Sequence, residues 1–136
     1  MSQLNNSRIM IKFHLEGTAK TPLIDFNGET GILELKGRSI PENSVEFFQP
    51  ITAWLDDYET APKADTVVEM KLEYFNTSSS KCILDFFKKL EKMNGVSTNV
   101  KVNWYFETDD EDMAEAGEDY QAIVELPFTI IEIDEI

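Results

Sequence analysis

Residues 66–93 read TVVEMKLEYFNTSSSKCILDFFKKLEKM and pass from a strand pattern to a helix pattern. Apolar side chains alternate over 66–75, which predicts a strand with one buried face. The predicted inward positions are Val68, Met70, Leu72 and Tyr74. Over 79–93 the apolar residues recur at helical spacing, and lysines occupy the opposite side. A strand followed directly by an amphipathic helix is part of a βαβ unit, so an α/β protein is expected.

The residues before this unit carry shorter strand patterns. Residues 9–16 alternate, and their predicted inward side chains are Ile9, Ile11, Phe13 and Leu15. A second short strand is expected over 23–26, followed by the turn signal Asn-Gly at 27–28. Residues 32–36 predict a return strand that ends at Gly37. These segments are therefore expected to pair as an antiparallel meander.

A helix is predicted after this meander. Ser39 is followed three residues later by Glu42, which is the spacing of a capping box with Ser39 as the cap. Apolar residues then recur at helical spacing as far as Glu59, and they are Val45, Phe48, Leu55 and Tyr58. Pro50 lies inside this helix and removes a backbone donor, so a bend is expected there.

The residues after the central unit predict a strand over 100–106, an acidic helix over 108–124 and a last strand over 127–133. Thr108 and Glu111 again have capping-box spacing. Parallel strands covered on both faces read as continuous apolar runs, whereas these strands alternate. The predicted fold is an α/β protein with a mixed sheet, in which an N-terminal antiparallel meander precedes parallel strands and about three helices cover mainly one face.

Length and charge restrict the class of protein. The chain has 136 residues, which suits a single domain over 1–136 with 1–7 flexible. A net charge of −14 repels phosphate backbones and anionic lipids, so neither a nucleic-acid nor a membrane partner is predicted. The single cysteine, Cys82, allows no intramolecular disulfide and is expected to be buried or half-buried. The polar residues 1–7 predict no signal peptide. A cytoplasmic protein that is monomeric when free is expected.

The residue types that catalysis requires are sparse. His14 is the only histidine, and it lies on the polar face of a predicted strand. One histidine and one cysteine do not supply the four ligands of a zinc site. The acidic run at 109–112 lacks the glycine and later ligands of a calcium loop. We therefore predict no catalytic residue, no cofactor, no metal site and no enzymatic activity.

Residues 76–80, Asn-Thr-Ser-Ser-Ser, place four hydroxyl side chains between the central strand and its helix. Helix capping is one interpretation, because Asn, Thr and Ser side chains accept from free N–H groups at a helix start. Phosphorylation is the other, because those N–H groups and the helix dipole favour an anion, which Lys81 helps to neutralise. The residues alone leave both interpretations open.

Four stretches carry a family resemblance: EGTAKTP at 16–22, PEN at 41–43, LEYFNTSSSK at 72–81 and WYF at 104–106. The Tyr-Phe-Asn-Thr-Ser-Ser block is the most specific of them. With these residues the chain resembles the SiaC-type bacterial regulatory phosphoproteins, which are relatives in fold of the STAS-domain anti-anti-sigma factors. The resemblance covers most of the chain and implies a STAS-like sheet with helices on one face.

The same resemblance implies a partner switch. Thr77 would be phosphorylated by a dedicated protein kinase and cleared by a metal-dependent serine/threonine phosphatase. The unphosphorylated protein would bind and activate a diguanylate cyclase, in cyclic-di-GMP signalling and biofilm formation. The implied neighbours of the phosphorylation site and partner contacts are Asn76, Ser78, Ser79, Ser80, Lys81, Pro41, Glu42 and Asn43. The alternative is a constitutive protein-binding adaptor, or an anti-anti-sigma-like factor, in which Thr77 is only a helix cap.

Overall fold

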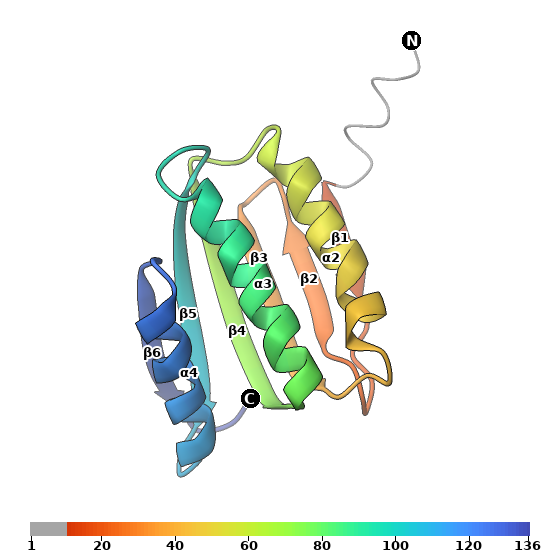
Figure 1. The fold of residues 1–136 in the computed structure, drawn as a ribbon, viewed down its shortest axis with the longest axis vertical. Helices are drawn as coiled ribbons and strands as arrows, with labels where there is room; N and C mark the ends of the chain where they lie inside the picture. Colours follow the sequence, from red (N-terminus) through yellow and green to blue (C-terminus); the bar gives the residue numbers. More distant parts are fainter. Residues whose placement is uncertain (1–10) are drawn as a thin grey trace.

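The computed structural model describes residues 11–136 and contains a six-stranded sheet whose strands follow sequence order (Figure 1). The strands are β1 Lys12–Leu15, β2 Leu23–Asn27, β3 Ile32–Ser39, β4 Asp65–Phe75, β5 Asn99–Glu107 and β6 Phe128–Ile133. The first three strands pair antiparallel, and β3 to β6 pair parallel. This confirms the predicted meander and mixed sheet. The flexibility predicted for 1–7 and the inward position predicted for Ile9 lie outside the described residues.

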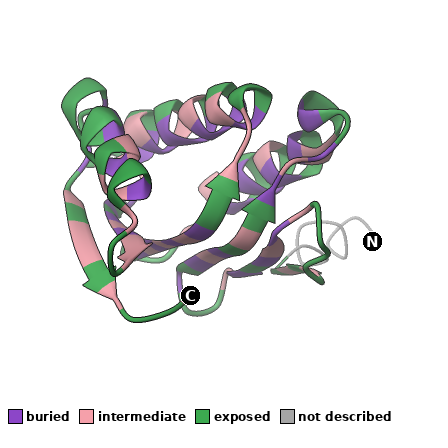
Figure 2. Ribbon diagram, turned by 90° about the horizontal axis from the view of Figure 1, so that it is seen from below, coloured by how far each residue is buried: buried purple, intermediate pink, exposed green. Residues whose placement is uncertain are grey.

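Three helices in the described part of the chain connect the parallel strands. They are α2 Ser44–Glu59, α3 Thr77–Met93 and α4 Glu111–Ile123. All three pack on the same face of the sheet, and buried residues line the surfaces between helices and sheet (Figure 2). Outward residues such as Lys36 and Lys101 leave the opposite face in contact with solvent. The prediction that helices cover one face is confirmed. No helix within 11–136 has the length and hydropathy that crossing a membrane requires.

Aromatic side chains form the centre of the core. The Phe26 ring lies 5.3 Å from that of Trp54 and 5.9 Å from that of Phe86, measured between centroids. These contacts join β2 to α2 and α3, so the meander and the helices share one apolar cluster. Burying each side chain of this size stabilises the fold by roughly 1.5–3 kcal/mol. Cys82 is also buried, as the sequence predicts.

The start of α2 differs from the prediction. Asn43 caps this helix, because its side chain accepts a hydrogen bond from the Glu46 N–H at 3.0 Å. Ser39, the predicted cap, is instead the buried last residue of β3, which continues through Gly37. The predicted break at Gly37 is therefore also wrong. Val45, one of the apolar residues at helical spacing, is 73% exposed because it lies on the outer side of the first helical turn.

Pro50 lies inside α2, which is continuous from Ser44 to Glu59. Proline supplies no N–H, so the Glu46 carbonyl one turn earlier receives no backbone bond from position 50. The Thr52 hydroxyl donates to the backbone oxygen of Gln49 at 3.0 Å. The helix therefore continues past a residue that removes one of its backbone bonds. The bend expected at Pro50 remains a prediction.

The start of α4 also differs. The predicted cap, Thr108, donates its backbone N–H to the Ile133 oxygen at 2.8 Å and so extends the pairing of β5 with β6. Asp109 then turns the chain with a φ of 74°. Asp110 caps the helix by accepting from the Met113 N–H at 3.1 Å. Thr108 therefore continues the pairing of β5 with β6 and does not cap the helix.

An extra residue interrupts the pairing of β4 with β3. Gly37 is opposite Leu72, but the next residue, Arg38, is opposite Tyr74. Glu73 therefore has no partner on β3, which is the arrangement of a β-bulge. A bulge of this kind changes which side chains point toward the core on the residues that follow it.

The residues after the bulge show this change. Tyr74, predicted to be inward, is 52% exposed. Phe75 is directed into the core instead, where its ring centroid lies 6.2 Å from that of Trp104 and 6.4 Å from that of Tyr120. The prediction for Tyr74 is wrong because simple alternation does not continue through the extra residue.

Candidate functional site

The starts of all three helices lie at one edge of the sheet. Strands β3, β4 and β5 run parallel, and each is followed by a helix, so their carboxyl ends share that edge. The helix caps at this edge are Asn43, Asn76 and Asp110. The sheet therefore places the 41–43 loop at the same edge as Thr77.

Asn76 begins α3. Its backbone is extended, and its side-chain oxygen accepts from the Ser79 N–H at 2.9 Å. Thr77 follows as the first residue of the helix. The interpretation of Thr77 as the helix cap is therefore wrong, since Asn76 has that role.

Substituting Asn76 and Thr77 one at a time distinguishes the helix cap from the residue that follows it. Asn76→Ala is expected to lower the free energy of unfolding by about 1 kcal/mol, because the Ser79 N–H loses its acceptor. Thr77→Ala is expected to change it by less than about 0.5 kcal/mol, because that side chain is exposed. Urea unfolding of both variants measures the difference. An equal loss in the two variants would mean that Thr77 contributes to the cap after all.

Two of the four hydroxyls hold the helix starts together. Ser79 is 0% exposed, and its hydroxyl donates to the Ser39 backbone oxygen at 3.0 Å. The Ser78 hydroxyl lies 2.7 Å from the hydroxyl of Ser44, the first residue of α2. These contacts join the end of β3 and the start of α2 to the first turn of α3. Both hydroxyls are therefore already used inside the fold.

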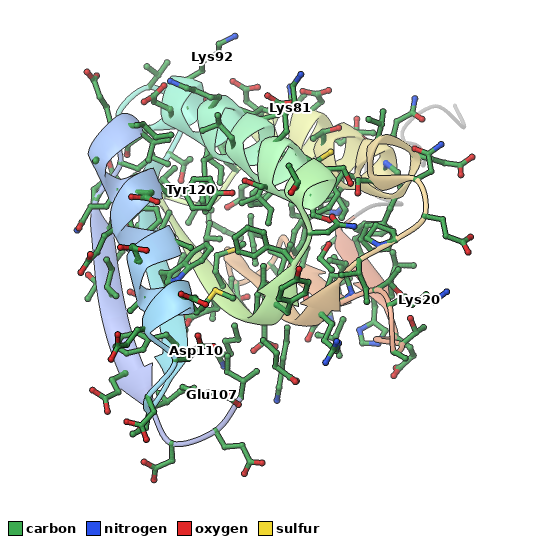
Figure 3. The ribbon with its side chains drawn as sticks, turned by 60° about the horizontal axis from the view of Figure 1, so that its bottom comes forward. Lys20, Lys81, Lys92, Glu107, Asp110 and Tyr120 are labelled. Atoms are coloured by element: carbon green, nitrogen blue, oxygen red, sulfur yellow. The ribbon has the colours of Figure 1, made fainter. Side chains whose placement is uncertain are left out.

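Ser80 is connected to α4. The Tyr120 hydroxyl donates to the Ser80 backbone oxygen at 2.8 Å and lies 3.1 Å from the Ser80 hydroxyl. Tyr120 points from α4 toward α3 (Figure 3). Burial raises the pKa of Tyr120, although the hydrogen bond to Ser80 opposes this, so the phenol keeps its proton at neutral pH. This bond fixes α4 against the first turn of α3.

Thr77 differs from its three neighbours. Ser78 is exposed as Thr77 is, but Thr77 is the one whose side chain receives no hydrogen bond from any residue of 11–136. Lys81, also exposed, follows one helical turn later on the same side. Thr77 borders a groove between α3 and α4 whose other residues include Leu84, Asp119 and Ile123. Among the hydroxyls of this cluster, that of Thr77 is the one free to react.

The 41–43 loop approaches this site indirectly. Pro41 is buried, whereas Glu42 and Asn43 are exposed. Glu42 pairs with Lys20 of the β1–β2 loop at 3.8 Å, which draws that loop toward the same edge. The next residue, Ser44, contacts the cluster, because its hydroxyl lies 2.7 Å from that of Ser78 and 3.3 Å from that of Ser79. The three loop residues therefore border the cluster without bonding to Thr77.

Sequence reasoning did not identify three residues of this site, namely Ser39, Ser44 and Tyr120. Ser39 and Ser79 are 40 positions apart, as are Ser80 and Tyr120. A polar residue at the last position of an apolar strand is a weak signal for such a contact, and Ser39 fits it. Tyr120 has the helical spacing of a core residue, and nothing in the spacing indicates its polar contact.

The remaining candidates for chemistry lie away from this edge or form no cluster. His14 is exposed, and its ring nitrogens lie 2.8 Å from Glu16 and 3.6 Å from Asp25. The hydrogen bond to Glu16 is the main cause that raises the pKa of His14; desolvation opposes it, and the hydrogen bond to Asp25 adds to it. Residues 11–136 contain no group of three His, Cys, Asp or Glu side chains arranged to hold a metal ion. The hydroxyl cluster therefore remains the candidate site.

Comparison with known proteins identifies the class. The family described as "SiaC family regulatory phosphoprotein" matches residues 15–133. An uncharacterized protein of Pseudomonas aeruginosa strain UCBPP-PA14 is 31% identical over 126 residues, which are 93% of this chain and all of that protein. The sheet, the helix arrangement and these matches define a small α/β regulatory protein.

Solved structures agree with this class. A chain in the crystal structure of the diguanylate cyclase SiaD in complex with its activator SiaC from Pseudomonas aeruginosa matches with a TM-score of 0.83 and 30% identity, over 89% of this chain and 99% of that one. Apo-SiaC from the same species matches with a TM-score of 0.80 and 30% identity, over 88% of this chain and 98% of that one. The chain belongs to the SiaC family of regulatory phosphoproteins.

Proposed function

We propose that this protein is a phosphorylation-controlled activator of a diguanylate cyclase, with Thr77 as the residue that carries the phosphate. The unphosphorylated form binds and activates the cyclase, and the phosphorylated form does not. A protein kinase adds the phosphate, and a metal-dependent serine/threonine phosphatase removes it. The chain catalyses no reaction in this scheme. It works in the cytoplasm and is monomeric until it binds a partner.

The accessibility of Thr77 carries this proposal. A kinase must reach the hydroxyl that it modifies, and Thr77 is exposed at the start of α3. Ser79 is fully buried, and Ser80 is half-buried beside the Tyr120 hydroxyl. Ser78 is exposed, but its hydroxyl lies 2.7 Å from that of Ser44. Modifying any of these three would break a contact that joins two elements. Modification of Thr77 leaves those contacts intact.

The start of α3 also suits a phosphate electrostatically. A phosphate adds about −1.5 to −2 charges and three acceptor oxygens. The positive end of the helix dipole favours an anion at this position. Lys81 lies one turn away and supplies a compensating charge. The modification is therefore expected to change the surface of α3 without unfolding it.

A diguanylate cyclase is proposed as the partner because the similar protein SiaC binds one. SiaC of Pseudomonas aeruginosa is the activator of the diguanylate cyclase SiaD and forms a complex with it. The present chain matches a chain of that complex over 89% of its length. A fold retained to this extent supports the same kind of partner for this protein.

Thr77 variants test the switch. Thr77→Glu is expected to weaken binding to the SiaD-type cyclase of the same organism by about tenfold, and Thr77→Ala to bind as the wild type does. Isothermal titration measures binding, and cyclic-di-GMP production measures activation. Phosphopeptide mass spectrometry of 74–81, on protein isolated from its own cells, locates the phosphate. Because glutamate carries less charge than a phosphate, kinase-treated protein is the decisive form.

Two outcomes would contradict this function. Equal binding by the bare and the phosphorylated protein would leave a constitutive adaptor, the alternative that the sequence left open. Phosphate found on Ser78 or Ser80 and not on Thr77 would move the site and remove the argument from accessibility. A circular dichroism spectrum of each variant shows that any loss of binding does not come from unfolding.

A further inference from the structure

The outward surface of α3 is basic on a molecule whose net charge is −14. This helix contains four lysines and two acidic residues. Lys81 and Lys92 project from α3 away from the sheet (Figure 3). Neither makes an ion pair with any other residue of the described part of the chain. Lys88 is exposed between them, with its ammonium 3.7 Å from Glu91.

The helices on both sides of α3 are acidic. Within Ser44–Glu59, α2 contains four acidic residues and no lysine or arginine. Within Glu111–Ile123, α4 contains five acidic residues and again no basic one. The positive charge of the helical face is therefore confined to one helix, and negative charge borders it on each side.

Thr77 lies at the N-terminal end of this basic surface. An α-helix turns by about 100° per residue, so Thr77, Lys81, Lys88 and Lys92 fall within an arc of about 60°. The acidic Asp85 lies at the edge of the same arc. These five residues form the α3 stripe, which is about 22 Å long at 1.5 Å per residue.

We infer that the α3 stripe is the surface on which a single acidic helix of the regulatory partner docks, and that phosphate on Thr77 weakens this docking by cancelling the charge of the stripe. The inference rests on the function proposed above and adds the surface, the chemistry of the partner segment and the physical basis of the switch.

The borders of the stripe determine the shape of the partner segment. A helix with its side chains is about 10–12 Å across, which is the width of the one helix that bears the stripe. A broader anion, such as a duplex or a lipid surface, would also meet the acidic side chains of α2 and α4 and be repelled. Exposed apolar residues flank the stripe, with Val45 at the start of α2 and Ile123 at the end of α4. They give an amphipathic partner helix apolar contacts beside the ion pairs.

The phosphate acts on the charge of the stripe directly. Three lysines and Asp85 give the bare stripe a net charge of about +2, and a phosphate adds about −1.5 to −2. The stripe then has almost no net charge, and its negative end lies one turn from Lys81. On the whole molecule, already at −14, the same addition is small. The switch therefore acts where the partner docks and leaves the rest of the surface nearly unchanged.

Charge reversal tests the stripe. The double variant Lys88→Glu/Lys92→Glu is expected to bind the purified, full-length SiaD-type cyclase about tenfold more weakly or worse, and the loss is expected to shrink at high salt. The matched control is Lys36→Glu/Lys101→Glu, which makes the same change of charge on the open face of the sheet. The control is expected to bind as the wild type does. Because all four lysines are exposed, each variant is expected to fold, which urea unfolding confirms.

The outcomes separate this inference from the switch itself. If phosphorylation weakens binding while Lys88→Glu/Lys92→Glu binds like its control, the switch stands and the stripe is excluded as the docking surface. If the stripe variant loses binding while phosphorylation has no effect, the stripe docks the partner but the phosphate does not control it. Phosphorylation of the stripe variant provides a third test, because a shared surface predicts a smaller further loss than in the wild type. A change in self-association alone, seen by sedimentation, would assign the stripe to a second copy and overturn the inference.

Discussion

Phe86→Ala is expected to lower the free energy of unfolding by about 3–5 kcal/mol. Phe86 is 0% exposed and stacks on Phe26 of β2, with ring centroids 5.9 Å apart. It also contacts Phe87, whose centroid lies 6.0 Å away. Truncation removes the apolar surface that joins α3 to the meander and leaves a cavity that rigid aromatic neighbours cannot fill. Urea unfolding followed by far-ultraviolet circular dichroism measures the loss.

Lys88→Ala is the matched control for this substitution. It lies on the same helix, two residues later, and it is exposed. We expect its unfolding free energy to remain within about 0.5 kcal/mol of the wild type. A loss of less than about 1.5 kcal/mol for Phe86→Ala would mean that the core collapses around the missing ring and that α3 does not depend on this contact.

Gly117→Ala is expected to lower the unfolding free energy by about 1–3 kcal/mol through overpacking. Gly117 faces the buried indole of Trp104, and an added Cβ would lie 2.7 Å from Nε1 and 2.9 Å from Cγ. The indole is held in place, because its Nε1–H donates to the Met113 oxygen at 2.9 Å. The helix must therefore move away from the sheet to admit one methyl group.

The sign of the change in unfolding free energy shows which of two opposing effects is larger. Helix propensity alone predicts that Gly→Ala stabilises by about 1 kcal/mol, so the two effects oppose one another. A stabilised Gly117→Ala variant would show that α4 moves outward at no cost. The next residue, Glu118, is exposed, and Glu118→Ala is expected to change stability by less than about 0.5 kcal/mol. Because α4 also carries Tyr120, its displacement would weaken the bond to Ser80 beside Thr77.

The sequence predicted the elements better than their ends. Alternation and helical spacing are repeated signals, so six strands and three helices were placed in the right order with the right pairing. Helix starts depend on a single residue, and Ser39 and Thr108 both had the residue type and spacing of a cap. Each was used by a strand instead, since β3 and β5 extend further than their apolar patterns. Backbone pairing between strands is a tertiary contact, and a capping motif does not predict it.

The candidate site was predicted in part for the same reason. Thr77 lies where a strand pattern meets a helix pattern, so its place at that junction follows from neighbouring residues alone. Its accessibility depends on which hydroxyls the fold uses, and this follows from contacts with Ser39, Ser44 and Tyr120. Those partners come from three other elements. The sequence therefore identified the cluster of hydroxyls, and the structure shows that Ser78, Ser79 and Ser80 bond to other elements whereas the Thr77 side chain does not within 11–136.

The unpaired Glu73 adds one residue to the length of β4 before α3 begins, so it helps to set where the first turn of α3 lies along the sheet. Deleting Glu73 would restore simple alternation from Leu72 and leave Phe75 inward, but it would draw Asn76 back along the sheet by about 3.3 Å, the rise of one strand residue. The first turn of α3 would move with it, and the hydroxyls of Ser78 and Ser79 would be displaced from Ser44 and from the Ser39 oxygen. A one-residue deletion is therefore expected to be tolerated better in the loops 60–64 and 94–98 than in the bulged segment.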